Sequence, residues 1–258
     1  MSEFDVSSAL KSLKNDYTEE TASEFIESLL YNPSELSDED HDIIDQLQSS
    51  FLRTAAQIFV EDLAYDFNTL VNYWEAFIGQ LTEEQSSKLL EFALEQTDVD
   101  FVEDFIIGYR KFYVNPNESI TFFNKLDANE FHEIKFFIGR CYEALEDYEN
   151  AIVYYQQYLN HPYFEAEENL EQASINSFYI NHTIATLYYK LGNMKKVVEV
   201  ANNIIEPIGF TQYLENFTSP EDSEIKSFLI DYANALEETN ETEKAISLRD
   251  KINEFYSI

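Results

Sequence analysis

The side chains that most often perform catalysis or bind metal ions are few in this chain and far apart in its sequence. Its four histidines are His41, His132, His161 and His182. None of them forms the H-E-x-x-H pattern, which places two imidazoles on one helix face as zinc ligands. The single cysteine, Cys141, has no evident base near it in sequence, so we expect a buried structural thiol rather than a nucleophile.

A calcium-binding loop and a phosphate-binding loop are not complete in the sequence. Asp98, Asp100 and Asp104 begin like a calcium-binding loop, but the central Gly and the Glu at the twelfth position of such a loop are missing. An acidic helix N-terminus is the better interpretation. No glycine-rich phosphate loop occurs. The sequence therefore predicts no catalytic residue, no metal site and no cofactor, and a protein that is not an enzyme.

Arg140 and Lys190 stand out because basic side chains are scarce in the chain. Each could hold a carboxylate of a binding partner, Arg140 through two parallel hydrogen bonds. The alternative is that each cation pairs with an acid of the same chain. For Arg140, Glu143 and Glu146 are near in sequence.

The chain of 258 residues carries 50 acidic and 16 basic side chains, a formal net charge of -34. Residues 1–104 hold 25 of the acidic side chains and only 4 of the basic ones. A field of this sign repels nucleic-acid phosphates and anionic lipid headgroups. We therefore expect protein or peptide partners, basic ones above all, with no direct binding to nucleic acid or membrane. The alternative is that the acidic side chains only solvate exposed helix faces.

No feature of the sequence points to export or to a membrane. Residues 1–10 lack the basic and then apolar pattern of a signal peptide. No apolar run approaches the roughly 18 residues of a membrane span. One cysteine cannot form an intrachain disulfide. A cytoplasmic protein is expected, and the oligomeric state stays open.

Five glycines and five prolines are too few for a sheet protein with many tight turns, so the composition favours helices joined by short loops. Helices are predicted over 2–14, 18–31, 37–50, 52–79, 82–96, 99–113, 117–126, 129–145, 148–160, 167–190, 193–205, 221–238 and 241–256. Thr82 and Gln85 form a capping box. Residues 66–69 offer a break within 52–79, and 206–219 is predicted to be a long connection.

Residues 136–155 contain two predicted helices with small and aromatic residues at regular positions. Gly139 is followed by Tyr142 in the first helix, and Ala151 by Tyr155 in the second. This spacing resembles a tetratricopeptide repeat, a helical hairpin of about 34 residues. The small residues should let two antiparallel helices approach closely. The two tyrosines should then fill the space between neighbouring hairpins.

Two further copies follow the same order. Their repeat positions are Ala185, Tyr188, Gly192, Ala233 and Ala245. Val197 replaces the second small residue of one copy, and Arg249 replaces the later aromatic of the other, as suits a terminal, solvent-facing repeat. Upstream, Gly108 marks a degenerate fourth copy.

The anchors Gly139, Ala185 and Ala233 are 46 and 48 residues apart, which exceeds the family's period. The extra residues fall in 161–176 and 206–220 and are predicted to be insertions or elongated helices. The predicted fold is all-α, with residues 101–258 as antiparallel hairpins stacked in a tetratricopeptide-like α-solenoid. Residues 1–100 would form an acidic helical region, either degenerate hairpins or a cap.

In this family the first helix of each hairpin lines a concave groove that accepts a peptide or a partner helix. Carried over by position, the groove residues are Glu133, Phe136, Arg140, Glu143, Tyr179, His182, Thr186, Tyr189, Lys190, Ile230, Asn234 and Glu237. The resemblance implies a non-catalytic scaffold or adaptor that binds a protein or peptide in this groove.

Two other functions stay open. The acidic first part favours an inhibitor or immunity-type protein that binds a basic nuclease or DNA-binding protein, with an affinity that falls with salt. A peptide-sensing regulator is another alternative. Regulators of that kind usually carry a basic helix-turn-helix at the N-terminus, whereas this N-terminus is acidic.

Overall fold

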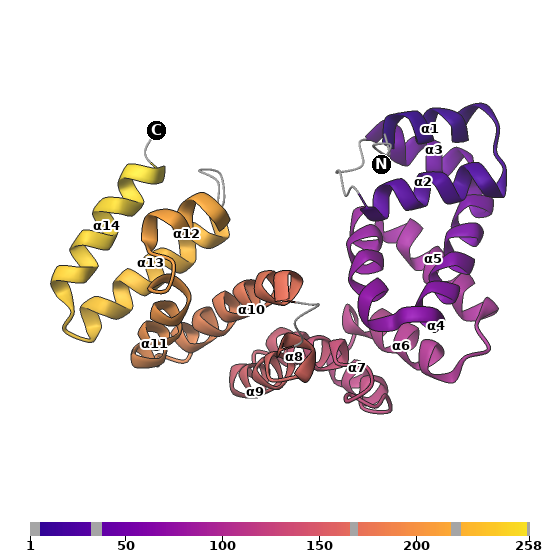
Figure 1. Ribbon diagram of the computed structural model, residues 1–258. Coiled ribbons are helices and arrows are strands. Elements are labelled where there is room, and N and C mark those ends of the chain that lie inside the picture. Colours follow the sequence, from indigo (N-terminus) through magenta and orange to yellow (C-terminus); the bar gives the residue numbers. More distant parts are fainter. Residues whose placement is uncertain (1–5, 32–37, 166–169, 218–222, 257–258) are drawn as a thin grey trace. The chain divides into compact units, whose positions relative to one another are not determined.

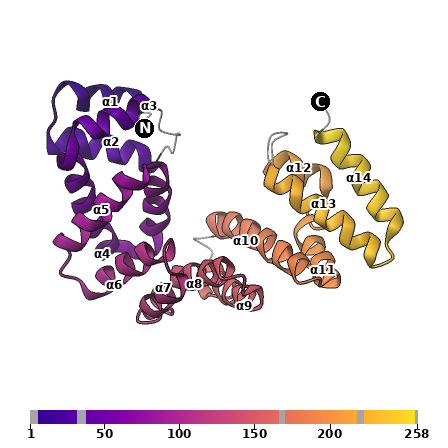
Figure 2. The ribbon, with the colours of Figure 1, turned by 180° about the vertical axis from the view of Figure 1, so that it is seen from behind.

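The computed structural model describes residues 6–31, 38–165, 170–217 and 223–256, and every regular element in these ranges is a helix (Figures 1 and 2). The predicted all-α class is thus confirmed. The helices are α1 (Val6–Asn15), α2 (Glu19–Tyr31), α3 (Asp38–Gln46), α4 (Gln48–Gln80), α5 (Glu83–Gln96), α6 (Asp100–Phe112), α7 (Pro116–Phe123), α8 (Glu133–Ala144), α9 (Tyr148–Leu159), the 3-10 helix η1 (Pro162–Glu165), α10 (Leu170–Lys190), α11 (Met194–Ile205), α12 (Phe210–Phe217), α13 (Ser223–Glu238) and α14 (Thr242–Tyr256). None of them is both long and apolar enough to cross a membrane within the described ranges.

The chain divides into two compact units, Met1–Phe137 and Ile138–Ile258, with the boundary inside α8. Helices that follow each other in sequence pack as pairs within a unit: α4 with α5, α6 with α7, α10 with α11, and α13 with α14. The predicted division after residue 100 falls between α5 and α6, inside the first unit.

Helix α4 consists of two segments that fold back on each other at the predicted break. Asp66 leaves helical geometry (φ -148°, ψ 79°), and its Oδ1 accepts a hydrogen bond from the backbone N–H of Thr69 (3.2 Å), which caps the second segment. The rings of Phe59 and Trp74 lie 5.0 Å apart. Fifteen residues of straight helix would separate them by about 22 Å. The break therefore creates a helical hairpin inside the first unit.

The predicted capping box starts α5. Thr82 accepts a hydrogen bond from the backbone of Gln85, and the Gln85 side chain accepts one from the backbone of Thr82. The Gln85 amide also donates to Asp45 (3.0 Å) at the end of α3. One buried side chain thus both caps a helix and joins two elements.

The three predicted repeats share one turn. Glu146 (φ 58°), Gly192 (φ 71°) and Asn240 (φ 67°) each lie seven residues after the repeat anchor and adopt a left-handed conformation. In every copy this residue's N–H donates to the carbonyl three residues back, and the next N–H donates to the carbonyl five residues back, at 2.8–3.1 Å. This arrangement satisfies helix-end carbonyls and reverses the chain. The same turn at the same position supports the internal repeat that the sequence predicted.

The two helices approach each other closely at Gly139, as predicted, but the role of Tyr155 differs from the prediction. A Cβ on Gly139 would lie 2.7 Å from the Tyr155 ring, so Tyr155 fills space inside its own hairpin, not between hairpins as predicted. Tyr142 likewise stacks on Tyr154 in the same hairpin (5.3 Å). The small residues at the other repeat positions are all fully buried: Ala151, Ala185, Ala233 and Ala245.

The degenerate copy in the first unit uses the same device. A Cβ on Gly108 of α6 would lie 2.8 Å from the Phe123 ring of α7. The buried Ser119 hydroxyl donates to the Gly108 carbonyl (2.6 Å). This hairpin has no left-handed residue in its turn, and its aromatic follows the glycine by 15 residues instead of 16.

In the second unit α10 and α13 run parallel, as the first helices of successive hairpins. His182 contacts Phe228 (ring centroids 4.4 Å apart), and Tyr189 accepts a hydrogen bond from Asn234 (3.3 Å). The later residue of α10 contacts the later residue of α13, so the two helices run in the same direction. The extra residues of 161–176 form η1 and lengthen α10, except for residues 166–169, which lie outside the described part.

The prediction of a long connection over 206–219 is wrong, because α12 forms there (Figure 1). Phe210, Tyr213 and Leu214 form its apolar stripe, and the latter two are buried. Gly209 before it adopts a positive φ of 81°, which ends the preceding turn. An eight-residue helix is marginal alone, so its burial against the rest of the unit stabilises it.

The shared turn yields a stability prediction. Glu146→Gly should stabilise the protein by roughly 0.5–1 kcal/mol, because a side chain in the left-handed region is strained and glycine is not. Glu149→Gly, in the first turn of α9, is the control. There glycine should lower the free energy of unfolding by about as much as it raises it at position 146. Urea unfolding followed by circular dichroism measures both, and equal destabilisation by the two variants would contradict the assignment.

The helix crossing yields a second prediction. Gly139→Ala should destabilise the protein by roughly 1–3 kcal/mol, because its Cβ would enter the space of a buried ring. Gly79→Ala is the matched control, since nothing lies within 4 Å of its added Cβ and alanine favours a helix by up to about 1 kcal/mol. In a Tyr155→Ala background, the penalty of Gly139→Ala should vanish. A penalty that persists there would show that the ring is not its cause.

Candidate functional site

Reactive groups do not converge in the described part of the chain. No group of three or more His, Cys, Asp or Glu side chains there could hold a metal ion. Cys141 is buried. Nε2 of His132 lies 3.3 Å from Oε1 of Glu133, and both side chains are almost fully buried. Glu133 was predicted to face the groove and is instead an interior residue.

The groove residues of the first hairpin are largely committed to contacts within the protein. Phe136 is half-buried and contacts Phe137. Glu143 accepts a hydrogen bond from the Tyr155 hydroxyl (2.8 Å). Burial lowers the pKa of Arg140, against the opposing effect of the nearby Tyr155, Cys141 and Glu143. A guanidinium held in this environment is poorly placed to capture a partner's carboxylate.

His182 is a core residue, so its prediction as a groove residue is wrong. Its Nδ1 lies 2.7 Å from the Phe178 carbonyl oxygen, which can only accept, so Nδ1 donates. Its Nε2 then accepts from the Tyr213 hydroxyl at 2.5 Å. Tyr213 belongs to α12 and is fully buried. The inserted helix thus covers the part of α10 that the sequence assigned to the groove.

The other groove positions of α10 face a more open environment. Tyr179 is 55% exposed, and Thr186 is half-buried. Nζ of Lys190 lies 5.0 Å from the centre of the Tyr148 ring of α9. The repeat residue Tyr188 accepts from Gln156 of α9 at 3.5 Å, a long hydrogen bond that joins the same two helices.

The third hairpin has one exposed apolar groove position and a polar cluster. Ile230 is 43% exposed. Arg249 donates to Asn234 (2.9 Å) and pairs with Glu237 (2.7 Å). Arg249 stands where Tyr155 stands in the first hairpin, and Glu237 where Glu143 stands. The same two repeat positions are therefore in contact in both hairpins, through a hydrogen bond in the first and an ion pair in the third.

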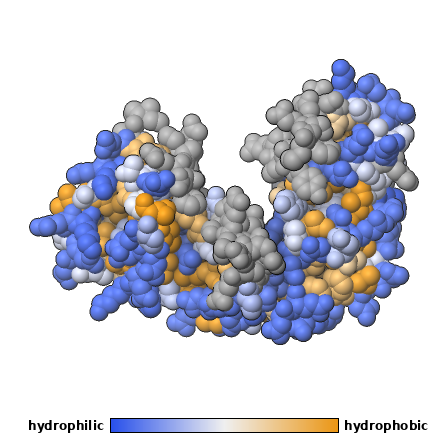
Figure 3. All heavy atoms as spheres, viewed as in Figure 1, coloured by the Kyte–Doolittle hydropathy of each residue, from blue (hydrophilic) through white to orange (hydrophobic). Residues whose placement is uncertain are grey.

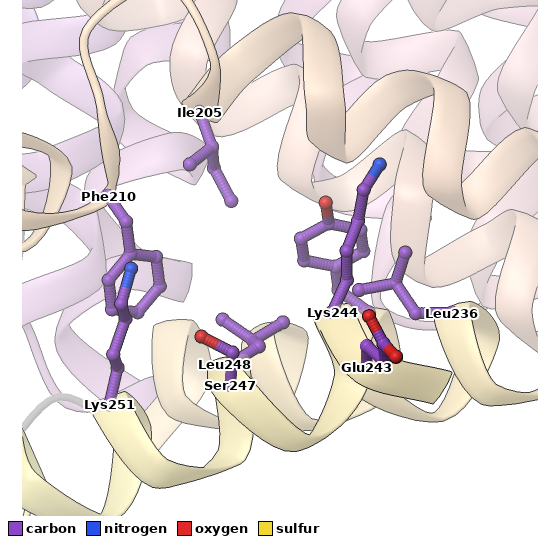
Figure 4. Close-up of a pocket in the computed structure, with 9 residues that line it drawn as sticks. Ile205, Phe210, Leu236, Glu243, Lys244, Ser247, Leu248 and Lys251 are labelled. Atoms are coloured by element: carbon purple, nitrogen blue, oxygen red, sulfur yellow. The ribbon is translucent and has the colours of Figure 1, made fainter. Parts of the chain in front are cut away.

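A pocket in the second unit lies away from the predicted groove, between the end of α11, the start of α12, and α13 and α14 (Figure 4). Its volume is about 350 Å³. Its lining residues are Ile205, Phe210, Tyr232, Leu236, Glu243, Lys244, Ser247, Leu248 and Lys251. Figure 3 shows apolar residues among hydrophilic ones over this part of the unit. We call this space the α14 pocket.

Charged side chains stand at both ends of the α14 pocket, and its floor is apolar. Lys251 lies beside Phe210, with Nζ 5.3 Å from the ring centre. Lys244 lies at the other end beside Glu243, and its ammonium pairs with Glu241 (2.7 Å), which raises the pKa of Lys244. In Figure 4, Leu248 and Ser247 project from α14 between these ends.

One wall of the α14 pocket is a neutral tyrosine. The Tyr232 hydroxyl donates to Oδ1 of Asn202. Burial raises the pKa of Tyr232 to about 12, and the carboxylates of Glu206 and Glu241 add to this shift. The phenol therefore stays protonated near neutral pH and adds no charge to the pocket.

No protein-family model matches this chain, and no curated protein matches it.

Sequence reasoning missed the α14 pocket because α12 was missed. One signal was present: Lys244, Leu248 and Lys251 recur at i, i+4 and i+7 and share a face of α14. A second, more polar pocket of about 460 Å³ lies in the first unit beside Arg53 and Tyr17. There Arg53 already pairs with Glu95 (3.0 Å). The α14 pocket is the better candidate site, because it combines apolar area with a cation that faces it.

Tyr232 yields a pH prediction. Its folded-state pKa of about 12 exceeds the value near 10 of an unfolded tyrosine, so the unfolded chain loses this proton first. The stability that the neutral phenol provides is complete below pH 10 and is lost as pH rises toward 12. The stability of Tyr232→Phe should therefore fall less steeply than that of wild type between pH 10 and 12. This holds even if the two proteins already differ in stability at pH 8.

Urea midpoints at pH 8, 10 and 11 measure this slope. Tyr65→Phe is the control, because Tyr65 is 90% exposed and its removal should leave the slope unchanged. Parallel curves for wild type and Tyr232→Phe would contradict the assignment.

Proposed function

We propose that this chain is a non-catalytic protein-binding module, a scaffold or adaptor whose second unit holds a segment of another protein in the α14 pocket. The observation that carries the proposal is the pocket itself: an apolar floor bounded by four helices, with a lysine at each end. Concave sites with apolar linings and a few placed polar groups are typical binding sites. Covering such a floor removes apolar surface from water, at roughly 25 cal/mol for each Å².

We infer further that residues 101–258 are related to tetratricopeptide repeats. The identical turns of the three hairpins, their small buried anchors and the parallel course of α10 and α13 support this relationship. The long spacing between anchors departs from the family, and α12 accounts for part of it. A reducing compartment such as the cytoplasm suits a buried thiol such as that of Cys141.

The binding surface in this proposal differs from the family's groove. His182 and Glu133 are buried, and Glu143 and Asn234 are bonded within the protein. Tyr179 keeps an exposed ring on the first-helix side. A partner would thus be held mainly where α12 and α14 create the pocket.

An acidic inhibitor of a basic partner is the second candidate. Residues 1–104 carry most of the excess acid, and two of their four basic side chains, Arg53 and Lys88, are each paired with a glutamate of the same unit. Binding through this charge would weaken steeply with salt, because exposed charges are screened within about 8 Å at physiological ionic strength.

Photo-cross-linking separates the two candidates. With p-benzoylphenylalanine at position 247, beside the pocket floor, ultraviolet light should capture a discrete partner from a native extract, at low and at 0.5 M salt alike. The control places the same probe at Val153 of α9, which is 45% exposed and outside the pocket. No product at position 247, or the same products at both positions, would contradict the proposal. Products that vanish at 0.5 M salt would favour the acidic inhibitor.

A further inference from the structure

The ammonium group of Lys251 faces apolar surface at one end of the α14 pocket. It lies near the Phe210 ring, and no carboxylate of the described residues is within ion-pair distance of it. Lys190 and Lys226 also lie near an aromatic ring, but of these three lysines only Lys251 lines the α14 pocket. A ligand that occupied the pocket would have to leave this ammonium hydrated or supply its counter-charge.

The two ends of the pocket are not equivalent. The ammonium of Lys244 is already engaged by Glu241, and Glu243 stands beside it in the lining. A carboxylate of the ligand at that end would meet the like charges of Glu241 and Glu243 and gain little. A carboxylate at the Lys251 end would form a charge-assisted hydrogen bond with an ammonium that has no ion-pair partner among the described residues.

The spacing limits the length of the ligand. Lys244 and Lys251 are seven residues apart on one helix, which corresponds to about 10 Å along its axis. An extended peptide covers this distance with about three residues. The apolar floor between the ends, with Leu248 and Ile205, is suited to bulky apolar side chains.

We propose that the α14 pocket selects a short partner segment in which an acidic side chain stands beside bulky apolar ones, with the carboxylate bound by Lys251. This rests on the proposed function and names the chemistry of its partner. The rest of the partner should be neutral or basic, because the net charge of -34 repels a strongly acidic chain.

Two blocked peptides test the proposal. The probes are the acetylated and amidated pentapeptides Lys-Leu-Glu-Leu-Lys and Lys-Leu-Gln-Leu-Lys, which have no terminal charges and differ in one carboxylate. Bulk attraction to an acidic protein favours the glutamine peptide, since it carries one more net positive charge. A preference for the glutamate peptide must therefore come from a local cation. Saturation-transfer NMR at 0.15 M salt detects the weak binding expected of such short probes.

The 258-residue chain should bind the glutamate peptide roughly fivefold more tightly than the glutamine peptide, the gain of one partly exposed ion pair. Lys251→Gln should remove this preference and leave the binding of the glutamine peptide unchanged. Lys195→Gln is the matched control: it removes the same charge from an exposed position of α11 outside the pocket, and the preference should persist. Circular dichroism checks that both variants fold.

Equal binding of the two peptides, a preference that survives in Lys251→Gln, or the absence of binding by either peptide would overturn the proposal. The cross-link at position 247 does not depend on the charge of the bound segment. A partner captured there, together with equal binding of the two peptides, would overturn this inference alone and leave the proposed function standing.

Discussion

The close crossing of paired helices at residues without a bulky side chain is the constraint on which these hairpins depend. At Gly139 the Tyr155 ring occupies the space that a Cβ would need, and at Gly108 the Phe123 ring does the same. An aromatic ring laid directly on backbone buries much apolar area and fixes the distance between two helices. Each hairpin of this kind is therefore a rigid unit, and the elements around it must adapt to its face.

The turn between the two helices of each hairpin fixes where the second helix crosses the first. A left-handed residue seven positions after each anchor returns the second helix to the same place in three hairpins, although the residue is Glu146, Gly192 or Asn240. Only one of the three is glycine, so the geometry of the hairpin overrides the preference of the residue. The α6–α7 pair lacks this conformation and reaches its crossing with one residue fewer, which is why its sequence resembled the repeat only weakly.

The insertion of α12 changes the surface that the hairpins present. Tyr213 covers His182, so part of the face that would form a groove is closed by the protein itself. The same helix begins with Phe210, which together with α14 encloses an apolar floor and places a ring beside Lys251. One short segment thus closes part of the predicted groove and forms part of the α14 pocket.

The sequence alone was enough to predict the helical class, the break at Asp66, the capping box at Thr82 and the close approach of a second helix at Gly139. Each of these depends on neighbouring residues or on the helical period. Tertiary structure decided the rest. The ring that meets Gly139 is 16 positions away, and the residues that bury His182, Tyr213 and Phe228, are 31 and 46 positions away. The α14 pocket forms between four helices. The residue pattern of a single helix cannot predict the space that remains between it and the other three.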